Sequence, residues 1–217
     1  MQQISLHQVL PQVFAQRVGL TSDVWKKEVC FEKGNVYLVE AKSGKGKSTF
    51  CSYLLGYRHD YTGQICYDAE DIRDFSVSQW VDIRQRQVSM LFQEMRLFPE
   101  LTAWENVEIK NHLTRHIDRP TIEQWFDRLG IAEKLNVQAG ILSHGQQQRV
   151  AFIRSLVQPS DFLVIDEPIS HLDDVNAQLM AEMVTEMKEK TQCGVIATSI
   201  GKRLPLTYDH IMKLLKN

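Results

Sequence analysis

The sequence predicts an α/β fold with a mostly parallel sheet, an antiparallel β region near the N-terminus and an inserted helical lobe. Continuous apolar runs at residues 36–39, 162–165 and 194–197 are typical of strands that are covered on both faces of a parallel sheet. Helical patterns alternate with these runs, as they do in α/β folds. The first 35 residues or so contain strand patterns without long helices between them.

The elements follow in order along the chain. Residues 4–9 and 24–32 resemble strands and form the predicted antiparallel region, over about residues 1–35. The run at 36–39 leads into a glycine-rich turn, and residues 48–55 have the pattern of a helix that leaves this turn. The sequence thus predicts a strand, a tight turn and a helix in succession.

A helical lobe is expected over about residues 99–150, inserted into the α/β core. Residues 103–114 and 121–129 have helical patterns, and no convincing strand lies between them. A further helix is expected over residues 176–190, with apolar residues at helical spacing. We interpret this methionine-rich stripe as core rather than as a binding surface. Its members are Leu179, Met180, Met183, Val184 and Met187.

The composition limits the classes of function. A chain of 217 residues is long enough for one domain with a substantial core, so residues 1–217 are treated as a single domain. Lys and Arg number 25 against 27 Asp and Glu, and this net charge of -2 does not favour a nucleic-acid partner. The chain has neither a signal-like N-terminus nor a run of about 18 apolar residues, so we expect a cytosolic protein that does not itself cross a membrane.

Residues 41–49, AKSGKGKST, contain a phosphate-cradle pattern whose first glycine is replaced by Ala41. A positive φ at this position would cost an alanine roughly 1 kcal/mol or more, whereas a negative φ would be tolerated. The glycines allow successive N–H groups to point at phosphate oxygens, and the following helix presents its positive end. Lys47 would reach the β- and γ-phosphates, and the Ser48 hydroxyl would bind magnesium. The alternative is an ordinary surface turn rich in glycine and lysine. The predicted nucleotide-binding residues of the cradle are Ala41, Lys42, Ser43, Gly44, Lys45, Gly46, Lys47, Ser48 and Thr49.

Two carboxylates follow the apolar run at residues 162–165. Asp166 would hold the magnesium, directly or through water, and Glu167 would polarise an attacking water. The alternative is a solvated acidic pair, which so apolar a strand disfavours.

The segment LSHGQQQR at residues 142–149 precedes these carboxylates. Together with the cradle, it makes nearly the whole chain resemble the nucleotide-binding subunits of the ATP-binding cassette (ABC) family, most of all those that serve cell division, lipoprotein release and macrolide export. The resemblance implies a P-loop NTPase core, ATP and Mg²⁺ as cofactors, and a head-to-tail dimer of two copies or of two related subunits. Each ATP would lie between the cradle of one subunit and the signature residues of the other. These residues are Ser143, His144, Gly145 and Gln146.

The resemblance also implies roles for other positions. Gln93 matches the glutamine that approaches the magnesium and the attacking water. Phe14 is the candidate for the aromatic ring that stacks on adenine, and it is preferred to Trp25, which lies closer to the strand leading into the cradle. The alternative for Phe14 is a packed core residue. The loop through which the two subunits sense each other matches Ser170, His171, Leu172 and Asp173.

Besides Ala41, two further positions depart from the family pattern. His144 replaces a signature glycine, and its imidazole either contacts the γ-phosphate of the partner site or points away. Ser199 stands where the family has a histidine that contacts the γ-phosphate. Serine is shorter and carries no charge, and a lost contact of this kind typically costs a factor of about 10² in rate. We therefore expect slow hydrolysis unless Glu167, Gln93 or His144 compensates.

The resemblance implies an ATPase subunit that powers a membrane transporter or a membrane-embedded complex. It would lie in the cytoplasm, on the inner face of the cell membrane, bound to a separate integral-membrane permease. The surface for this partner would include Leu97, Phe98 and Pro99, and the alternative for this segment is a turn that caps the core. One alternative is a scaffold that is controlled by ATP but scarcely hydrolyses it, which Ser199 favours. Another is a soluble nucleotide kinase, which the signature segment and the Asp-Glu pair disfavour.

Overall fold

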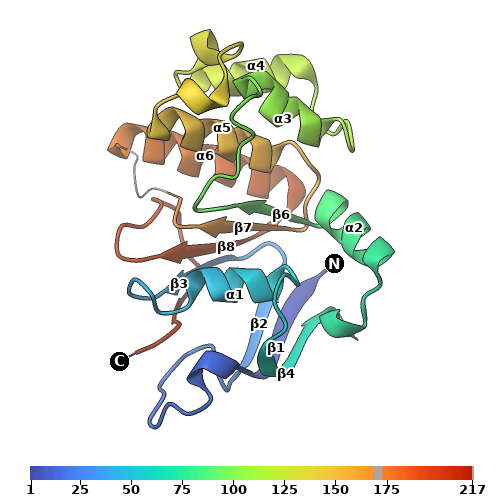
Figure 1. Ribbon diagram of the computed structural model, residues 1–217, viewed down its shortest axis with the longest axis vertical. Helices are drawn as coiled ribbons and strands as arrows, with labels where there is room; N and C mark the ends of the chain where they lie inside the picture. Colours follow the sequence, from blue (N-terminus) through green and yellow to red (C-terminus); the bar gives the residue numbers. More distant parts are fainter. Residues whose placement is uncertain (169–172, 217) are drawn as a thin grey trace.

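Two β-sheets form the framework of the chain in a computed structural model that describes residues 1–168 and 173–216. The first is an antiparallel sheet with the strand order β2-β1-β4-β5, which lies at the lower end of the molecule in Figure 1. Its strands are β1 (Gln3–Pro11), β2 (Glu28–Glu32), β4 (Tyr61–Tyr67) and β5 (Glu70–Asp71).

The second sheet is parallel and has the strand order β6-β7-β8-β3-β9. Its middle strand, β8, lies between β7 and β3, so the strand that leads into the cradle is one strand away from the strand that ends in the two carboxylates. The three apolar runs predicted to be buried strands are confirmed. The strands are β3 (Val36–Glu40), β6 (Val88–Leu91), β7 (Phe162–Asp166), β8 (Gly194–Ser199) and β9 (His210–Lys213).

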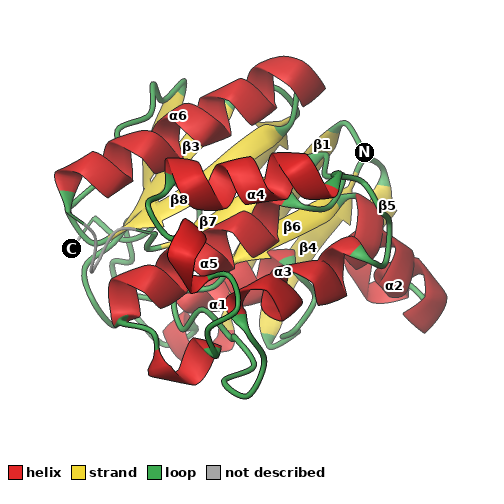
Figure 2. Cartoon of the chain, turned by 90° about the horizontal axis from the view of Figure 1, so that it is seen from above, coloured by secondary structure: helices red, strands yellow, loops and turns green. Residues whose placement is uncertain are grey.

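Helices cover both faces of the parallel sheet, and Figures 1 and 2 show α3, α4, α5 and α6 on one side and α1 on the other. The α-helices are α1 (Lys47–Leu54), α2 (Val77–Arg86), α3 (Ala103–Asn111), α4 (Arg119–Arg128), α5 (His144–Leu156) and α6 (Asp174–Thr191). Short 3₁₀ turns are found at Gln12–Phe14, Ile72–Asp74, Ala132–Lys134 and Ala139–Ile141. No helix in the described part of the chain has both the length and the apolar character needed to cross a membrane.

Strand β7 explains why the central strands read as continuous apolar runs. Phe162 and Val164 belong to the core shared with α1 and the antiparallel sheet, whereas Leu163 and Ile165 belong to the core under α5 and α6. Both faces are covered, so no position of the strand is left for a polar residue. The second core also holds the stripe on α6, where Met180, Met183 and Val184 are buried and Leu179 and Met187 pack against it, as predicted.

Part of the predicted antiparallel region is wrong. The strand expected over residues 24–32 begins only at Glu28, because residues 24–27 form a turn. The Ser22 hydroxyl accepts hydrogen bonds from the N–H groups of Val24 at 2.9 Å and Trp25 at 2.8 Å. These two N–H groups are therefore not available to pair with a neighbouring strand. The sheet is completed instead by β4 and β5, which follow α1 in the sequence and were not predicted. Helix α3 ends at Asn111, three residues before the expected end.

Candidate functional site

The turn between β3 and α1 has the backbone conformation of a phosphate cradle. Gly44 has φ 69° and Gly46, the N-cap of α1, has φ 92°, and both values favour glycine. Ala41 is not among the residues with positive φ, so the methyl group that replaces the expected glycine causes no backbone strain. Its N–H donates to the Ser199 carbonyl at 3.1 Å, which ties the start of the turn to β8.

Lys47 is the first residue of α1, and its side chain is 3% exposed. The ammonium donates to the carbonyls of Ala41 at 3.0 Å and Lys42 at 3.1 Å, and it lies 3.2 Å from the Glu167 Oε1 atom. A buried ammonium requires such partners. The contacts hold the charge of Lys47 between the cradle and the end of β7.

Asp166 and Glu167 lie together at the carboxyl end of β7, with 3% and 8% of their surface exposed. Thr198 of β8 links them, because its hydroxyl donates to Asp166 Oδ1 at 2.5 Å and accepts from the Glu167 N–H at 3.2 Å. Glu167 has φ 48°, a left-handed conformation that costs a residue with a side chain roughly 1 kcal/mol. The sequence analysis missed Thr198, although parallel pairing of β7 and β8 places it directly beside Asp166.

Cys51 lies in α1 close behind these carboxylates. Burial raises the pKa of the Cys51 thiol well above its usual value, and the negative charges of Asp166 and Glu167 raise it further. The side chain therefore remains a neutral thiol and packs as part of the core.

A cavity of about 370 Å³ opens in front of the cradle. It is the place where the predicted cradle, the predicted glutamine and one of the predicted carboxylates meet. It is lined by Val13, Phe14, Ser43, Gly44, Gly46, Lys47, Ser48, Thr49, Arg58, Gln93, Glu167 and Ile200. Several predicted residues do not line it, namely Ala41, Lys42, Lys45, Asp166, Ser199 and the four signature residues.

Phe14 lies over the cradle. A Cβ atom added to Gly46 would be 3.5 Å from a carbon of the Phe14 ring. Trp25, the second aromatic candidate, is 1% exposed and packs edge-on against Phe50 and Tyr53 inside the core, so its ring is not accessible to a base. The structure thus places only the first of these two rings at the cavity, while its stacking on adenine stays a prediction.

Arg58 also lines the cavity, and sequence reasoning missed it because it lies in a loop without a recognisable motif. Its guanidinium binds both carboxylate oxygens of Asp60, at 2.9 and 2.5 Å, and donates to the Thr49 hydroxyl at 3.3 Å. A cationic group is therefore positioned beside a cradle residue.

Ser199 ends β8, but its side chain is directed into its own turn. The hydroxyl donates to the Lys202 carbonyl at 2.8 Å and accepts from the Gly201 N–H at 3.0 Å, and the residue is 2% exposed. The next residue, Ile200, is 49% exposed and lines the cavity. The apolar residue Ile200 therefore lines the cavity, whereas Ser199, which stands at the place of the family's histidine, does not.

The signature segment opens α5 with a capping box. The Ser143 hydroxyl accepts from the Gln146 N–H at 3.3 Å, and the Gln146 side chain accepts from the Ser143 N–H at 3.0 Å. Ser143 and His144 are exposed, and Gly145 is half-buried. The positive end of α5 is therefore presented outside the cavity of its own chain, where it can meet an anion that belongs to another molecule.

The far end of α5 holds the segment that follows Gln93. Arg154 donates to the carbonyls of Met95 and, at 2.8 Å, Arg96. Met95 and Arg96 have φ values of 59° and 49°, so this segment turns sharply at residues that disfavour the conformation. Burial lowers the pKa of Arg154 to about 10, which leaves the guanidinium charged at neutral pH.

Asp173 is the only predicted residue of the dimer-sensing loop within the described part of the chain, because Ser170, His171 and Leu172 lie outside it. It caps α6 by accepting the Asn176 N–H at 2.8 Å. Hydrogen bonds from Asn176 lower the pKa of Asp173. Arg149 of α5 donates to the Asn176 side chain at 3.1 Å, so the cap of α6 is linked to the signature helix.

The segment Leu97, Phe98 and Pro99 connects the core to the lobe. Phe98 is 51% exposed, while its N–H and carbonyl are both bound by the buried side chain of Asn106, at 2.8 and 2.9 Å. A small cavity of about 150 Å³ adjoins it, lined partly by Leu97, Pro99 and Gly140. An apolar side chain is thus exposed on a rigidly held turn.

Comparison with known proteins gives consistent results. The family model described as ABC transporter matches residues 26–170. The chain is 31% identical over 199 residues to the thiamine import ATP-binding protein ThiQ of Haemophilus ducreyi, with 90% of this chain and 81% of that protein covered. It is 32% identical over 184 residues to an uncharacterized ABC transporter ATP-binding protein of Mycobacterium tuberculosis, with 83% of this chain and 56% of that protein covered. The chain therefore spans about half the length of this relative.

Solved structures show the same fold. The dimeric structure of a bacterial ABC transporter cassette matches with a TM-score of 0.76 and 22% identity, covering 91% of this chain and 88% of that one. A bacterial Atm1-family ABC exporter with ATP bound matches with a TM-score of 0.75 and 21% identity, covering 100% of this chain and 38% of that one. With a family match over more than half of its residues and a relative above 30% identity along most of its length, the chain belongs to the ABC transporter family.

Proposed function

We propose that the chain binds and hydrolyses ATP, dimerises on ATP, and thereby powers a membrane transporter or a membrane-embedded complex. The observation that carries this proposal is the cavity of about 370 Å³ in which the cradle, Gln93 and Glu167 converge from three separate segments. A surface turn that merely resembled a cradle would not be expected to lie beside the other groups that hydrolysis requires.

The residues support a defined division of labour. The phosphates would accept hydrogen bonds from the cradle N–H groups, with Lys47 at the β- and γ-phosphates and the Phe14 ring against the base. Bound Mg²⁺ would supply positive charge to the phosphates, and Ser48, Gln93 and Asp166 offer the oxygen donors that this ion prefers. The Glu167 carboxylate would accept a hydrogen bond from the attacking water and then take up its proton.

The proposed reaction is an in-line displacement at phosphorus. The water oxygen forms a bond to the γ-phosphorus, the bond from this phosphorus to the β–γ bridging oxygen breaks, and ADP and inorganic phosphate leave. Ser199 is held in its own turn and Ile200 faces the cavity, so the described end of β8 brings no charged side chain to the cavity. We therefore expect slow turnover relative to a chain with histidine at this position.

Dimerisation follows from the position of the signature residues. They lie at the exposed start of α5 and do not line the cavity of their own chain, so a second subunit is needed to bring such a helix end to the γ-phosphate. One matching structure is a dimeric ATP-binding cassette in a post-hydrolysis state with ADP and phosphate.

The proposed partner is a separate integral-membrane permease, bound through the surface around Leu97, Phe98 and Pro99. Relatives of this chain include a thiamine import ATP-binding protein and a lipoprotein-releasing system ATP-binding protein, the latter from Buchnera aphidicola with 25% identity over 200 residues. Bound to such a permease, the chain would lie on the cytoplasmic face of the cell membrane.

The test is magnesium-dependent ATP turnover measured against protein concentration for the native chain, Glu167→Gln and Ser199→His. We expect turnover to rise faster than linearly with concentration, Glu167→Gln to lower it by about 10² or more, and Ser199→His to raise it. Size-exclusion chromatography with ATP should show Glu167→Gln as a stable dimer. Unchanged turnover in Glu167→Gln would refute the assigned base, and ATP-dependent dimers without turnover in any variant would favour the scaffold.

A further inference from the structure

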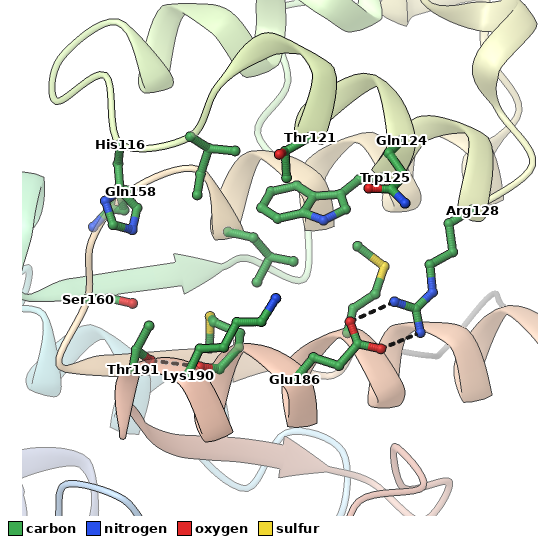
Figure 3. A pocket seen from close by; sticks show the side chains of 14 residues that line it. His116, Thr121, Gln124, Trp125, Arg128, Gln158, Ser160, Glu186, Lys190 and Thr191 are labelled. Atoms are coloured by element: carbon green, nitrogen blue, oxygen red, sulfur yellow. Dashed lines mark hydrogen bonds and ion pairs between the residues drawn. The ribbon is translucent and has the colours of Figure 1, made fainter.

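A second cavity, of about 480 Å³, lies between α4 of the lobe and the C-terminal half of α6 (Figure 3). Among the residues that the structure describes, none that lines it also lines the cavity at the cradle. Its volume falls within the range of roughly 300–1,000 Å³ that is common for small-molecule sites. The proposed binding and hydrolysis of ATP do not involve this second cavity.

The body of the second cavity is apolar. The Trp125 ring projects into it from α4, as Figure 3 shows, and Met183 and Met187 face it from α6. Ile117 and Leu156 complete the apolar lining. Thioether and indole groups are polarisable and adapt to ligands of varied shape, which suits an aromatic or aliphatic body better than a sugar or a phosphate chain.

The two basic side chains at its rim, Arg128 and Lys190, differ in their ion pairs with carboxylates. Arg128 is bound to Glu186 at 2.8 Å and to Glu182 at 3.2 Å, and Figure 3 shows its paired contacts with Glu186. Lys190, by contrast, forms no ion pair within 4.0 Å in the described part of the chain, although its charge helps to lower the pKa of Glu186 one turn earlier, and its side chain extends toward the space below the Trp125 ring. Among the described residues that line the cavity, Lys190 is thus the cation that an incoming anion can pair with without displacing a direct ion pair.

We propose that the second cavity binds a small amphiphilic anion, whose apolar body packs against Trp125, Met183 and Met187 and whose anionic head group pairs with Lys190. Such a molecule would contact the lobe through α4 and the core through α6. It would also touch Leu156, near the end of the helix that begins with the signature residues. Binding would therefore restrain the lobe against the core.

The probe is 1-anilinonaphthalene-8-sulfonate, an aromatic anion of suitable size, and the readout is the NMR spectrum of the full chain with ¹³C-labelled methionine methyl groups. The seven methionines give seven methyl signals. We expect saturable shifts at Met183 and Met187, with Met95, beside the Gln93 segment, and Met212, in β9, unchanged. N-phenyl-1-naphthylamine, which has the same body without the sulfonate, should bind at least fivefold more weakly.

Matched lysine variants separate the head-group contact from general charge effects. Lys190→Gln should weaken binding of the sulfonate about fivefold to tenfold and leave the uncharged analogue unaffected. Lys188→Gln, two residues earlier on the same helix but outside the lining, should leave both unchanged. Equal affinities in the two variants, or probe shifts at Met95 rather than Met183 and Met187, would overturn the proposal. The methyl readout does not depend on nucleotide binding, so failure here and failure of the proposed ATPase are distinguishable.

Discussion

Lys110 of α3 lies at the base of the lobe, and its ammonium donates to the Ser89 hydroxyl at 3.2 Å. The Ser89 hydroxyl in turn donates to the Ser155 carbonyl at 2.6 Å. Burial, and then the nearby charge of Arg154, lower the pKa of Lys110 to about 7. A lysine is thus placed where the fold opposes its protonation.

This environment predicts a stability that rises with pH. The unfolded chain keeps the Lys110 proton up to a pKa of about 10.4, so between about pH 7 and 8 this lysine binds more protons in the unfolded chain than in the folded chain; above about pH 8 the buried Cys51 thiol, whose pKa is raised, acts in the opposite direction. The free energy of unfolding should therefore increase by up to about 1.4 kcal/mol for each pH unit in this window, and this slope should vanish below pH 7, where both states hold the proton and the cost of the buried charge is fully present. Urea unfolding at several pH values, for the native chain and Lys110→Met, measures it.

In Lys110→Met the rise with pH should be lost and the stability at pH 7 should increase. The control is Lys27→Met, which changes an exposed lysine and should keep the native slope. If the native chain and Lys110→Met had the same slope, the ammonium would not be opposed by its surroundings.

Individual site residues were predictable where a motif fixes them. The neighbouring positions of Lys47 and the Asp166-Glu167 pair could be predicted because phosphate chemistry requires those groups at those places in the sequence, while their roles stay predictions. Thr198 and Arg58 were not found, because their positions depend on strand register and on the path of a loop. The side-chain direction of Ser199 depends likewise on a local turn that no pattern in the sequence specifies.

Two helices of the chain begin in the same way. Both α2 and α5 open with a Ser-x-x-Gln capping box, at Ser76 with Gln79 and at Ser143 with Gln146. Removing either serine should cost about 1 kcal/mol of stability, because an N–H group at the helix start loses its partner. The two boxes differ in that only α5 begins with the signature segment.

Ser143→Ala and Ser76→Ala therefore form a matched pair of variants that separates the capping of a helix from a role in ATP hydrolysis. Both should lower the free energy of unfolding by similar amounts, but only Ser143→Ala should lower ATP turnover, by about tenfold or more, since it removes a hydroxyl proposed to face the partner's nucleotide. Urea unfolding and steady-state turnover are measured on the same samples. Equal turnover in the two variants would remove the signature serine from the mechanism.

Strands were predicted best where both of their faces are buried. The strands β3, β7 and β8 were recognised because both their faces are apolar. Strand β4 was missed because it alternates exposed and buried residues and contains Gly63, at φ 85°. A Cβ atom there would lie 2.4 Å from the His7 carbonyl oxygen, so the close approach of β1 requires glycine at this position. The local sequence around Gly63 does not show this approach.

At the scale of the whole molecule, the exposed ring of Phe98 predicts where a permease binds. Phe98→Asp should abolish co-purification of an integral-membrane partner without changing ATP binding, because the backbone of this residue remains bound to Asn106. Val18→Asp, at a residue that is 98% exposed in the antiparallel region, is the control and should retain the partner. Retention of the partner by Phe98→Asp would move the docking surface elsewhere.

The contact between Lys47 and Glu167 imposes an order on the proposed cycle. The ammonium that is expected to bind phosphate also holds the carboxylate that is expected to activate water, at 3.2 Å. A γ-phosphate that draws Lys47 away would release Glu167, so the base would become available only once its substrate is seated. The pair would then act as an interlock. In the free subunit Lys47 would keep the Glu167 carboxylate from acting as a base, and breaking this ion pair would cost part of the free energy of nucleotide binding.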